Sequence, residues 1–294
     1  MQSGRRSLTS SKSGAKSILA IIIVVVLLAS TIGAFLFVTG DASASGTEVK
    51  IGSKVKLSYI GKLPDGRVFD TSIYSVAVDN TTYPKTPLFS FSGTSDKPLE
   101  LTVGQGGYIK GFEYGILGLK AGQTKNISIP VSLGYGAIDS TKLVTFDLTE
   151  TVPVTDVLTT AEFKTIFGVD ATSVSKITDP RYGWDVWVIG VDPVTGQVTV
   201  WNDVTSGSTY KAYANSDDAS YGWDITATVS GGSITVVHQL DGSSAGYVKG
   251  YDGGDSSKFI VYQVADGKVT INTDSKAEVK GTTIYFVVTI LSVS

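Results

Sequence analysis

The sequence predicts a mostly β protein of the α+β class, and two observations carry this prediction. Glycine is abundant in the 294-residue chain, and β-branched residues dominate its second half, a composition that favours strands. Several segments alternate apolar and polar residues with a period of two, as half-buried antiparallel strands do. The length suffices for one large or two ordinary domains.

The composition also excludes several kinds of site. There is no cysteine, so disulfides, thiol catalysis and Cys-ligated metals are excluded. The chain has one histidine, His238, which argues against a His-based triad or a multi-His metal site, and we predict a structural or surface role for it. The net charge of −3 argues against binding to nucleic acid, which usually requires a basic face. We expect neither a cofactor nor a metal.

The N-terminal region predicts a membrane anchor. Residues 18–38 are 21 consecutive uncharged, mostly apolar residues, which as a helix would span roughly 30 Å, the hydrocarbon thickness of a bilayer. Residues 1–17 carry four basic residues and no acidic one, which places the N-terminus in the cytoplasm and the rest of the chain outside. The competing interpretation is a signal peptide cleaved near ASA at residues 42–44, although its apolar region usually spans about 7–15 residues. Residues 39–47 form a flexible linker.

Strand and turn patterns follow the linker. Residues 54–61 alternate as a half-buried strand, and the turn at Pro64–Gly66 predicts a return strand over 67–70. Residues 73–97 are loop-like. A short helix is expected over residues 159–168, with a capping box at its start and a glycine at its end. Further strands are expected in segments 98–104, 126–136, 143–149 and 282–294.

The stretch VGQGGYIKGFEYGILGLKAGQ (residues 103–123) contains seven glycines and poses a choice between two interpretations. A phosphate-binding loop of the Walker type needs lysine where Phe112 stands, and a dinucleotide fingerprint needs glycine where Ile109 stands. A short helix fits better, because Ile109, Phe112 and Ile116 share one helical face. We therefore predict that the glycines allow this helix to pack closely inside a sheet.

An internal repeat occupies the second half of the chain. The sequence YGWD begins at Tyr182 and again at Tyr221, 39 residues later, and each copy leads into two alternating strands around a glycine turn. A third hairpin-like run, without YGWD, begins at Lys258. We predict that Trp184 and Trp223 lie in the hairpin core. The alternative is an exposed aromatic site for unfolded chains.

Three sequence blocks, in the expected order, resemble the FKBP family of peptidyl-prolyl isomerases. They are KVKLSYIGKLPDGRVFDTS, KPLELTVGQGGYIKGFEYGILGLKAGQTKNISIPVSLGYG and the terminal IYFVVTIL. The resemblance covers residues 48–137 and 280–294, and it implies an antiparallel sheet wrapped around a short helix. Residues 138–279 then resemble the domain that archaeal and bacterial members carry inserted in the flap after the YG motif, here β-rich and built of repeated hairpins.

The resemblance also implies a proline pocket in the form of an apolar aromatic basket. Ile109 would offer its backbone N–H to the substrate carbonyl, Tyr135 would donate its hydroxyl, and Phe112 would form the floor. The residues implied as catalytic are Tyr59, Phe69, Asp70, Ile109 and Tyr135, and those implied to bind substrate are Leu99, Tyr108, Phe112 and Phe286.

The sequence departs from the family pattern at three places. Leu99 stands where an aromatic residue is common, and the arginine that often follows FD and pairs with the aspartate is not evident. The run NTDSKAEVKG replaces the usual sequence before the last strand. These departures predict a less aromatic basket and weaker catalysis.

Together these features predict a membrane-anchored prolyl isomerase, outside the cytoplasm, that assists the folding of exported proteins. Its expected partners are proline-containing or unfolded polypeptides, bound in part by the inserted domain, the membrane, and macrolide ligands of the FKBP class. One alternative is a non-catalytic holdase chaperone with a vestigial pocket. Another is a structural or binding protein of the cell surface, which the repeated hairpins favour.

Overall fold

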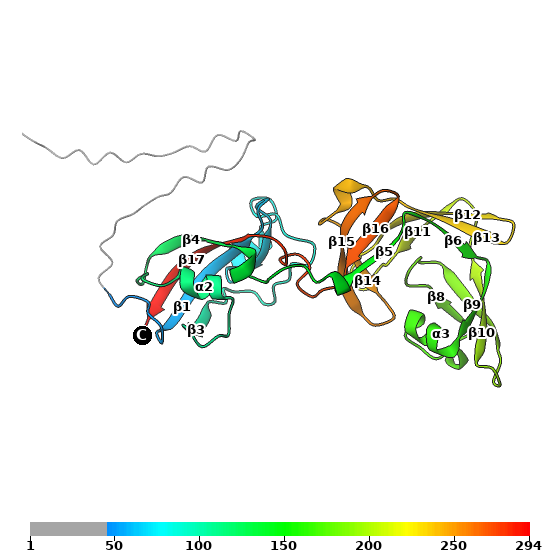
Figure 1. The fold of residues 1–294 in the computed structure, drawn as a ribbon, viewed down its shortest axis with the longest axis horizontal. Helices are drawn as coiled ribbons and strands as arrows, with labels where there is room; N and C mark the ends of the chain where they lie inside the picture. The colour runs from blue at the N-terminus through cyan, green and yellow to red at the C-terminus, as the bar shows by residue number, and fades with distance from the viewer. Residues whose placement is uncertain (1–45) are drawn as a thin grey trace, which may run out of the picture. The chain divides into compact units, whose positions relative to one another are not determined.

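The computed structural model describes residues 46–294, which contain four antiparallel sheets and three short α-helices (Figure 1). The prediction of a mostly β chain is therefore confirmed. The predicted transmembrane helix over residues 18–38 lies outside the described residues. Within residues 46–294, the helices are all too short or too polar to cross a bilayer.

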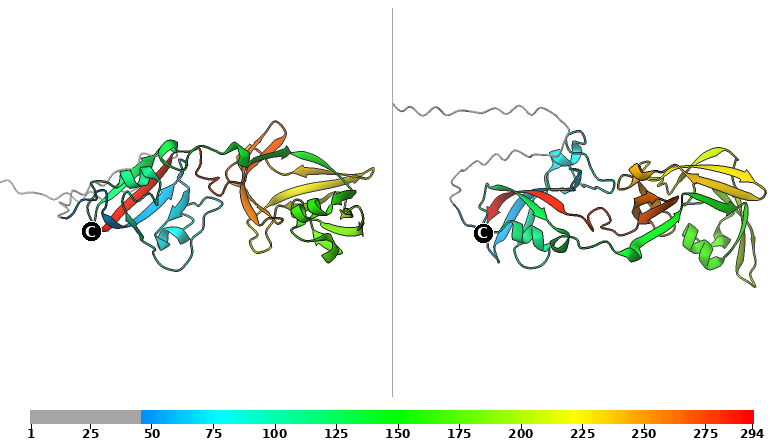
Figure 2. Two further views of the ribbon diagram at one scale, coloured as in Figure 1. Left: turned by 60° about the horizontal axis from the view of Figure 1, so that its bottom comes forward. Right: turned by 45° about the horizontal axis from the view of Figure 1, so that its top comes forward.

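The first sheet has five strands, and its central position is filled by the last strand of the chain. The order is β2-β1-β17-β4, with β3 also paired to β1. The strands are β1 (Lys54–Lys62), β2 (Val68–Thr71), β3 (Leu99–Thr102), β4 (Thr124–Ile129) and β17 (Ile284–Val293). Figure 1 and both views of Figure 2 show β17, in red, between β1 and β4.

Helix α2 (Lys110–Gly115) packs against β4 in the way that the glycine-rich stretch predicts. A Cβ on Gly111 would lie 2.4 Å from Cγ2 of Ile129, and one on Gly115 would lie 2.5 Å from Cγ2 of Ile127. Any side chain at either position would therefore push the helix away from the strand. The two glycines serve helix–sheet contact, so the prediction of a short helix is confirmed.

Two predicted boundaries in the first part of the chain are wrong. The segment 73–97 contains a five-residue helix, α1 (Tyr74–Val78), within the predicted loop. The strand predicted over 126–136 ends at Ile129, because Pro130 lacks the N–H that a strand ladder needs. A 3₁₀ turn, η1 (Val131–Leu133), follows it.

The other strands form three sheets with a common plan. Each sheet contains three consecutive strands, of which the second and third form a hairpin, and one strand from residues 143–159. The consecutive strands are β8 (Lys176–Thr178), β9 (Asp185–Val191) and β10 (Gln197–Asp203); β11 (Ser208–Ala212), β12 (Trp223–Ser230) and β13 (Ser233–His238); and β14 (Lys249–Asp252), β15 (Ser257–Ala265) and β16 (Lys268–Asn272). The three predicted hairpins are confirmed, and the repeat extends to whole sheets.

Residues 143–159, which we call the spine segment, contribute an edge strand to each of these sheets. β5 (Leu143–Asp147) pairs with β16, β6 (Thr149–Pro153) with β13, and β7 (Thr155–Thr159) with β10. Helix α3 (Thr160–Phe167) follows directly. Thr159 and Glu162 form its capping box, and Gly168 ends it in the left-handed conformation, as predicted.

The tryptophans of the two YGWD copies lie in the core at equivalent positions. Trp184 is 1% and Trp223 is 5% exposed, so they cannot form an exposed aromatic site. Each indole N–H donates to a side chain on the partner strand of its hairpin: Trp184 to Oδ1 of Asn202 and Trp223 to Nδ1 of His238, both at 2.9 Å.

His238 has a structural role in this core. Its side chain is buried, and Nδ1 accepts the hydrogen bond of Trp223, because an indole N–H can only donate. In the neutral ring the proton then resides on Nε2, which donates to Oε1 of Glu150 at 2.7 Å. Both ring nitrogens are therefore occupied, in agreement with the predicted structural role.

Two hydrophobic cores hold the described residues together. One lies between the first sheet and α2 and includes Leu57, Ile129 and Ile290. The other fills the space enclosed by the three repeated sheets and α3 and includes Phe163 and Trp184. The first core positions the candidate site.

Candidate active site

A cavity of about 390 Å³ opens where α2 meets the first sheet. Its lining comes from β1, β2, β3, β17, α2 and two loops. The lining residues are Tyr59, Asp70, Leu99, Gly107, Tyr108, Ile109, Phe112, Tyr135 and Phe286. All of the predicted site residues are among them except Phe69, which stands directly behind the wall. The fold thus brings the predicted set together, and the roles of its members remain predictions.

Five aromatic residues line this cavity, and Phe69 packs behind them. The ring of Phe286 meets those of Phe112 and Phe69 edge-on, with centroids 4.9 and 5.5 Å away, and that of Tyr59 at 5.9 Å. Phe69 in turn contacts Tyr135 edge-on at 6.5 Å. Apart from the tilted pair of Tyr59 and Phe286, these are the edge-to-face arrangements that aromatic rings prefer. The wall of the cavity is therefore largely aromatic.

One charged group lies in this apolar wall. The Tyr59 hydroxyl donates to Oδ2 of Asp70 at 2.9 Å. Burial, and then the Asp70 charge, raise the pKa of Tyr59, so its hydroxyl stays protonated and remains a donor. Burial also raises the pKa of Asp70, which the Tyr59 hydrogen bond, the Thr71 N–H and the charge of Lys276 oppose.

Two further residues of the lining carry hydrogen-bond donors. Ile109 has extended backbone angles and immediately precedes the first helical residue of α2, so its N–H has no partner within the helix. The Tyr135 hydroxyl also stays protonated, because burial and the nearby Asp70 charge raise its pKa.

Sequence reasoning missed two residues at this cavity. Gly107 contributes to its lining, and the ammonium nitrogen of Lys276 lies 5.8 Å from the ring centroid of Tyr135. Gly107 belongs to the glycine-rich stretch, so the sequence held a signal for it. Lys276 lies in the run NTDSKAEVKG, where the resemblance to the family is lost, so no motif pointed to it.

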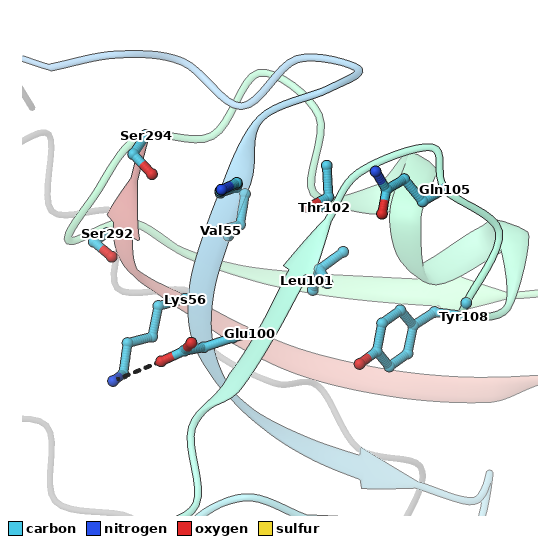
Figure 3. A pocket seen from close by; sticks show the side chains of 11 residues that line it. Val55, Lys56, Glu100, Leu101, Thr102, Gln105, Tyr108, Ser292 and Ser294 are labelled. Carbon is cyan, nitrogen blue, oxygen red and sulfur yellow. Dashed lines mark ion pairs between the residues drawn. The ribbon is translucent and has the colours of Figure 1, made fainter.

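A larger, open hollow of about 640 Å³ adjoins the aromatic cavity and shares Gly107 and Tyr108 with it. Figure 3 shows Tyr108 on one side of this hollow, Ser292 and Ser294 on the other, and the ion pair of Lys56 and Glu100 between them. Both partners of the ion pair are exposed, so it contributes little. With a polar, solvent-exposed lining, the hollow is not the candidate active site.

A sheet packed on one short helix, with an aromatic cavity between them, defines an FKBP-type domain. Residues 46–149 match the family model described as FKBP-type peptidyl-prolyl cis-trans isomerase. The chain therefore carries an FKBP-type peptidyl-prolyl cis-trans isomerase domain together with an additional β-rich region.

Two relatives indicate how far the likeness extends. The short-type peptidyl-prolyl cis-trans isomerase of Methanocaldococcus jannaschii is 37% identical over 91 residues, which are 31% of this chain and 53% of the relative. FK506-binding protein 3 of Candida albicans is 34% identical over 109 residues, which are 35% of this chain and 21% of the relative. The chain thus spans about half of the first relative and a fifth of the second.

Proposed function

We propose that this chain is a membrane-anchored peptidyl-prolyl cis-trans isomerase that assists the folding of exported proteins. The observation that carries the proposal is the aromatic cavity, whose lining includes the hydrogen-bonded pair of Tyr59 and Asp70 together with Ile109 and Tyr135. Proline-containing polypeptides would be its substrates, and macrolide ligands of the FKBP class would occupy the same cavity.

The cavity suits a rotation that needs no nucleophile. The prolyl C–N bond has partial double-bond character, which gives a rotational barrier of about 18–20 kcal/mol. The twisted transition state has lost this resonance and is less polar than the planar amide, so a dry aromatic surface favours it. The Ile109 N–H and the Tyr135 hydroxyl would hold the substrate carbonyl while the bond turns.

Removing one of these donors is expected to slow the reaction. In the variant Tyr135→Phe, kcat/KM should fall about tenfold, since a lost hydrogen bond of roughly 1.4 kcal/mol corresponds to that factor. Asp70→Ala should lower kcat/KM by a similar factor, because it removes the acceptor of Tyr59 and leaves that hydroxyl unpaired. A protease-coupled assay with an Xaa-Pro peptide on the full-length chain in detergent measures both effects.

Tyr114→Phe is the matched control, because Tyr114 lies on α2 outside the cavity and is 53% exposed. Its kcat/KM should equal that of the wild type. A wild-type chain without activity, together with Asp70 and Tyr135 variants that bind and behave like wild type, would exclude the enzyme and leave the holdase.

The membrane anchor rests on residues 18–38, whose length and flanking charges suit a single crossing with the N-terminus in the cytoplasm. Residues 46–294 would then act outside the cytoplasm. Fractionation of cells that express the full chain, or a chain starting at residue 46, tests this. An intact full-length chain found only in the soluble fraction would refute the anchor.

The β-rich region would bind unfolded clients, whether or not the cavity is catalytic. We interpret residues 138–279 as the domain inserted in the flap. Trp187 and Trp201 are directly opposite each other on β9 and β10, and they are 37% and 38% exposed. Val157 of β7, opposite Thr199 on β10, is 53% exposed. A sheet face with two exposed indoles suits apolar side chains of an unfolded chain.

Replacing both indoles, Trp187→Ser with Trp201→Ser, should abolish most of the suppression of aggregation of an unfolded test protein. The kcat/KM for a short Xaa-Pro peptide should not change, because such a peptide needs only the cavity. Val144→Ser is the control, since Val144 is 49% exposed on β5 of another sheet. Equal suppression by the double variant and the wild type would contradict client binding at this face.

A further inference from the structure

The chain between β16 and β17 is fixed against the first sheet by contacts of its own. We call residues 273–283 the return segment. Its Val279 is 6% exposed and belongs to the first hydrophobic core. The carboxylate of Glu278 accepts hydrogen bonds from the Leu88 N–H at 2.7 Å and from the Thr86 hydroxyl at 2.9 Å. The return segment therefore packs against the FKBP-type domain.

A turn in the return segment holds Lys276 beside the aromatic cavity. Asp274 is 8% exposed and anchors this turn: its Oδ1 accepts the Lys276 N–H at 2.8 Å, and its Oδ2 pairs with the Lys280 ammonium group. The side chain of Lys276 stays at the surface, with Nζ 5.8 Å from the ring centroid of Tyr135. This distance is within the range of a cation–π contact.

Among the groups that act on Asp70, Lys276 carries a positive charge. The groups that face it or its hydrogen-bond partner are the hydroxyl of Tyr59 from β1, the N–H of Thr71 from β2, Tyr108 from the chain before α2, Tyr135 from the loop after β4, and Lys276 from the return segment. The ion pairs formed within residues 46–294 do not include Asp70. Lys276 is a cation whose charge favours the ionised form of this carboxylate.

We propose that Lys276 is a positioning residue of the cavity, whose ammonium group, held over Tyr135 by the return segment, serves as the counter-charge of Asp70. Its charge favours the carboxylate form, which is the form that accepts the Tyr59 hydrogen bond. It acts through Asp70 and Tyr135 without touching the substrate. This counter-charge comes from beyond the family-matched part of the chain, residues 46–149.

The role in catalysis rests on the proposed isomerase function, so the test combines a kinetic and a non-kinetic measurement. The variants are Lys276→Met, which keeps the apolar stem, and Lys276→Arg, which restores the charge. Lys50→Met is the control, because Lys50 is an exposed lysine of the same domain. Full-length chains in detergent are studied by the pH dependence of kcat/KM and by NMR titration of the ¹³C-labelled Asp70 carboxyl group, assigned with Asp70→Asn.

Lys276→Met should move the Asp70 titration midpoint upward by roughly half a pH unit, as expected for the loss of one nearby, partly screened opposite charge. The acid limb of the kcat/KM profile should move by the same amount. Lys276→Arg should restore both values, and Lys50→Met should leave both unchanged. An unchanged midpoint in Lys276→Met, or failure of arginine to restore it, would overturn the proposal. A wild type without isomerase activity would refute the proposed function alone, because the titration still reports on Lys276.

Discussion

Replacing Phe286 by alanine is expected to cause the largest loss of activity of any single change in the cavity. The side chain is 5% exposed and contacts the rings of Phe69 and Phe112 edge-on. Its removal should lower the free energy of unfolding by about 3–5 kcal/mol, as is usual for a buried phenylalanine, and should lower kcat/KM at least 100-fold because the wall opens to water. Denaturant unfolding and the prolyl-peptide assay measure the two effects.

Phe286→Leu separates packing from the shape of the wall. Leucine preserves most of the buried volume but loses the edge-to-face contacts, which are worth about 0.5–1.5 kcal/mol each. Stability should fall less than in the alanine variant, while kcat/KM should still fall clearly. Both assays are run at a temperature at which circular dichroism shows each variant folded. If kcat/KM of the folded alanine variant stayed close to wild type, Phe286 would have no part in catalysis.

Gly183→Ala is expected to destabilise the β-rich region strongly. Gly183 has φ of +80°, and a Cβ there would lie 2.3 Å from the carbonyl oxygen of Lys211 on β11. The backbone of β11 cannot rotate away as a side chain can. Strain of about 1 kcal/mol from the backbone angle and roughly 1–3 kcal/mol from overpacking should add up in denaturant unfolding.

Gly207→Ala is the matched control, because Gly207 has φ of +82° but open space around its Cβ position. It should show the strain alone, about 1 kcal/mol. Gly222→Ala should resemble Gly183→Ala, since its Cβ would lie 2.4 Å from the Ala212 carbonyl oxygen. Equal losses in the free energy of unfolding at positions 183 and 207 would show that the contact of the new Cβ with β11 does not affect stability.

The hairpins and the longer of the short helices could be predicted because their signals are local. Alternation with a period of two marks β9, β10, β12 and β13, and the capping box of Thr159 marks α3. Helix α1 could not be predicted, because it has five residues and its N-cap, Ile73, makes no side-chain hydrogen bond. The end of β4 follows from Pro130, a local signal that the sequence does contain.

The candidate site could be predicted only through the resemblance to a family. Tyr59 and Phe286 are 227 positions apart in the sequence, and no periodicity relates them. The contribution of Lys276 could not be predicted, because its position depends on the hydrogen bond between its N–H and the side chain of Asp274. The pairing of the spine segment with three different sheets could not be predicted either, because strand pairing between residues far apart in the sequence leaves no local pattern.

The spine segment implies an order of events in the synthesis of the chain. Residues 143–159 leave the ribosome before β10, β13 and β16, and Asp147 is 121 positions ahead of its partner Lys268. Hairpins close locally within about 1–10 μs, whereas the spine segment must wait for its partners and close much longer loops. During that interval it is an unpaired strand edge, the kind of surface through which nascent chains aggregate. During its own synthesis, this chain would therefore need the same protection from aggregation that we propose the folded protein gives to unfolded clients.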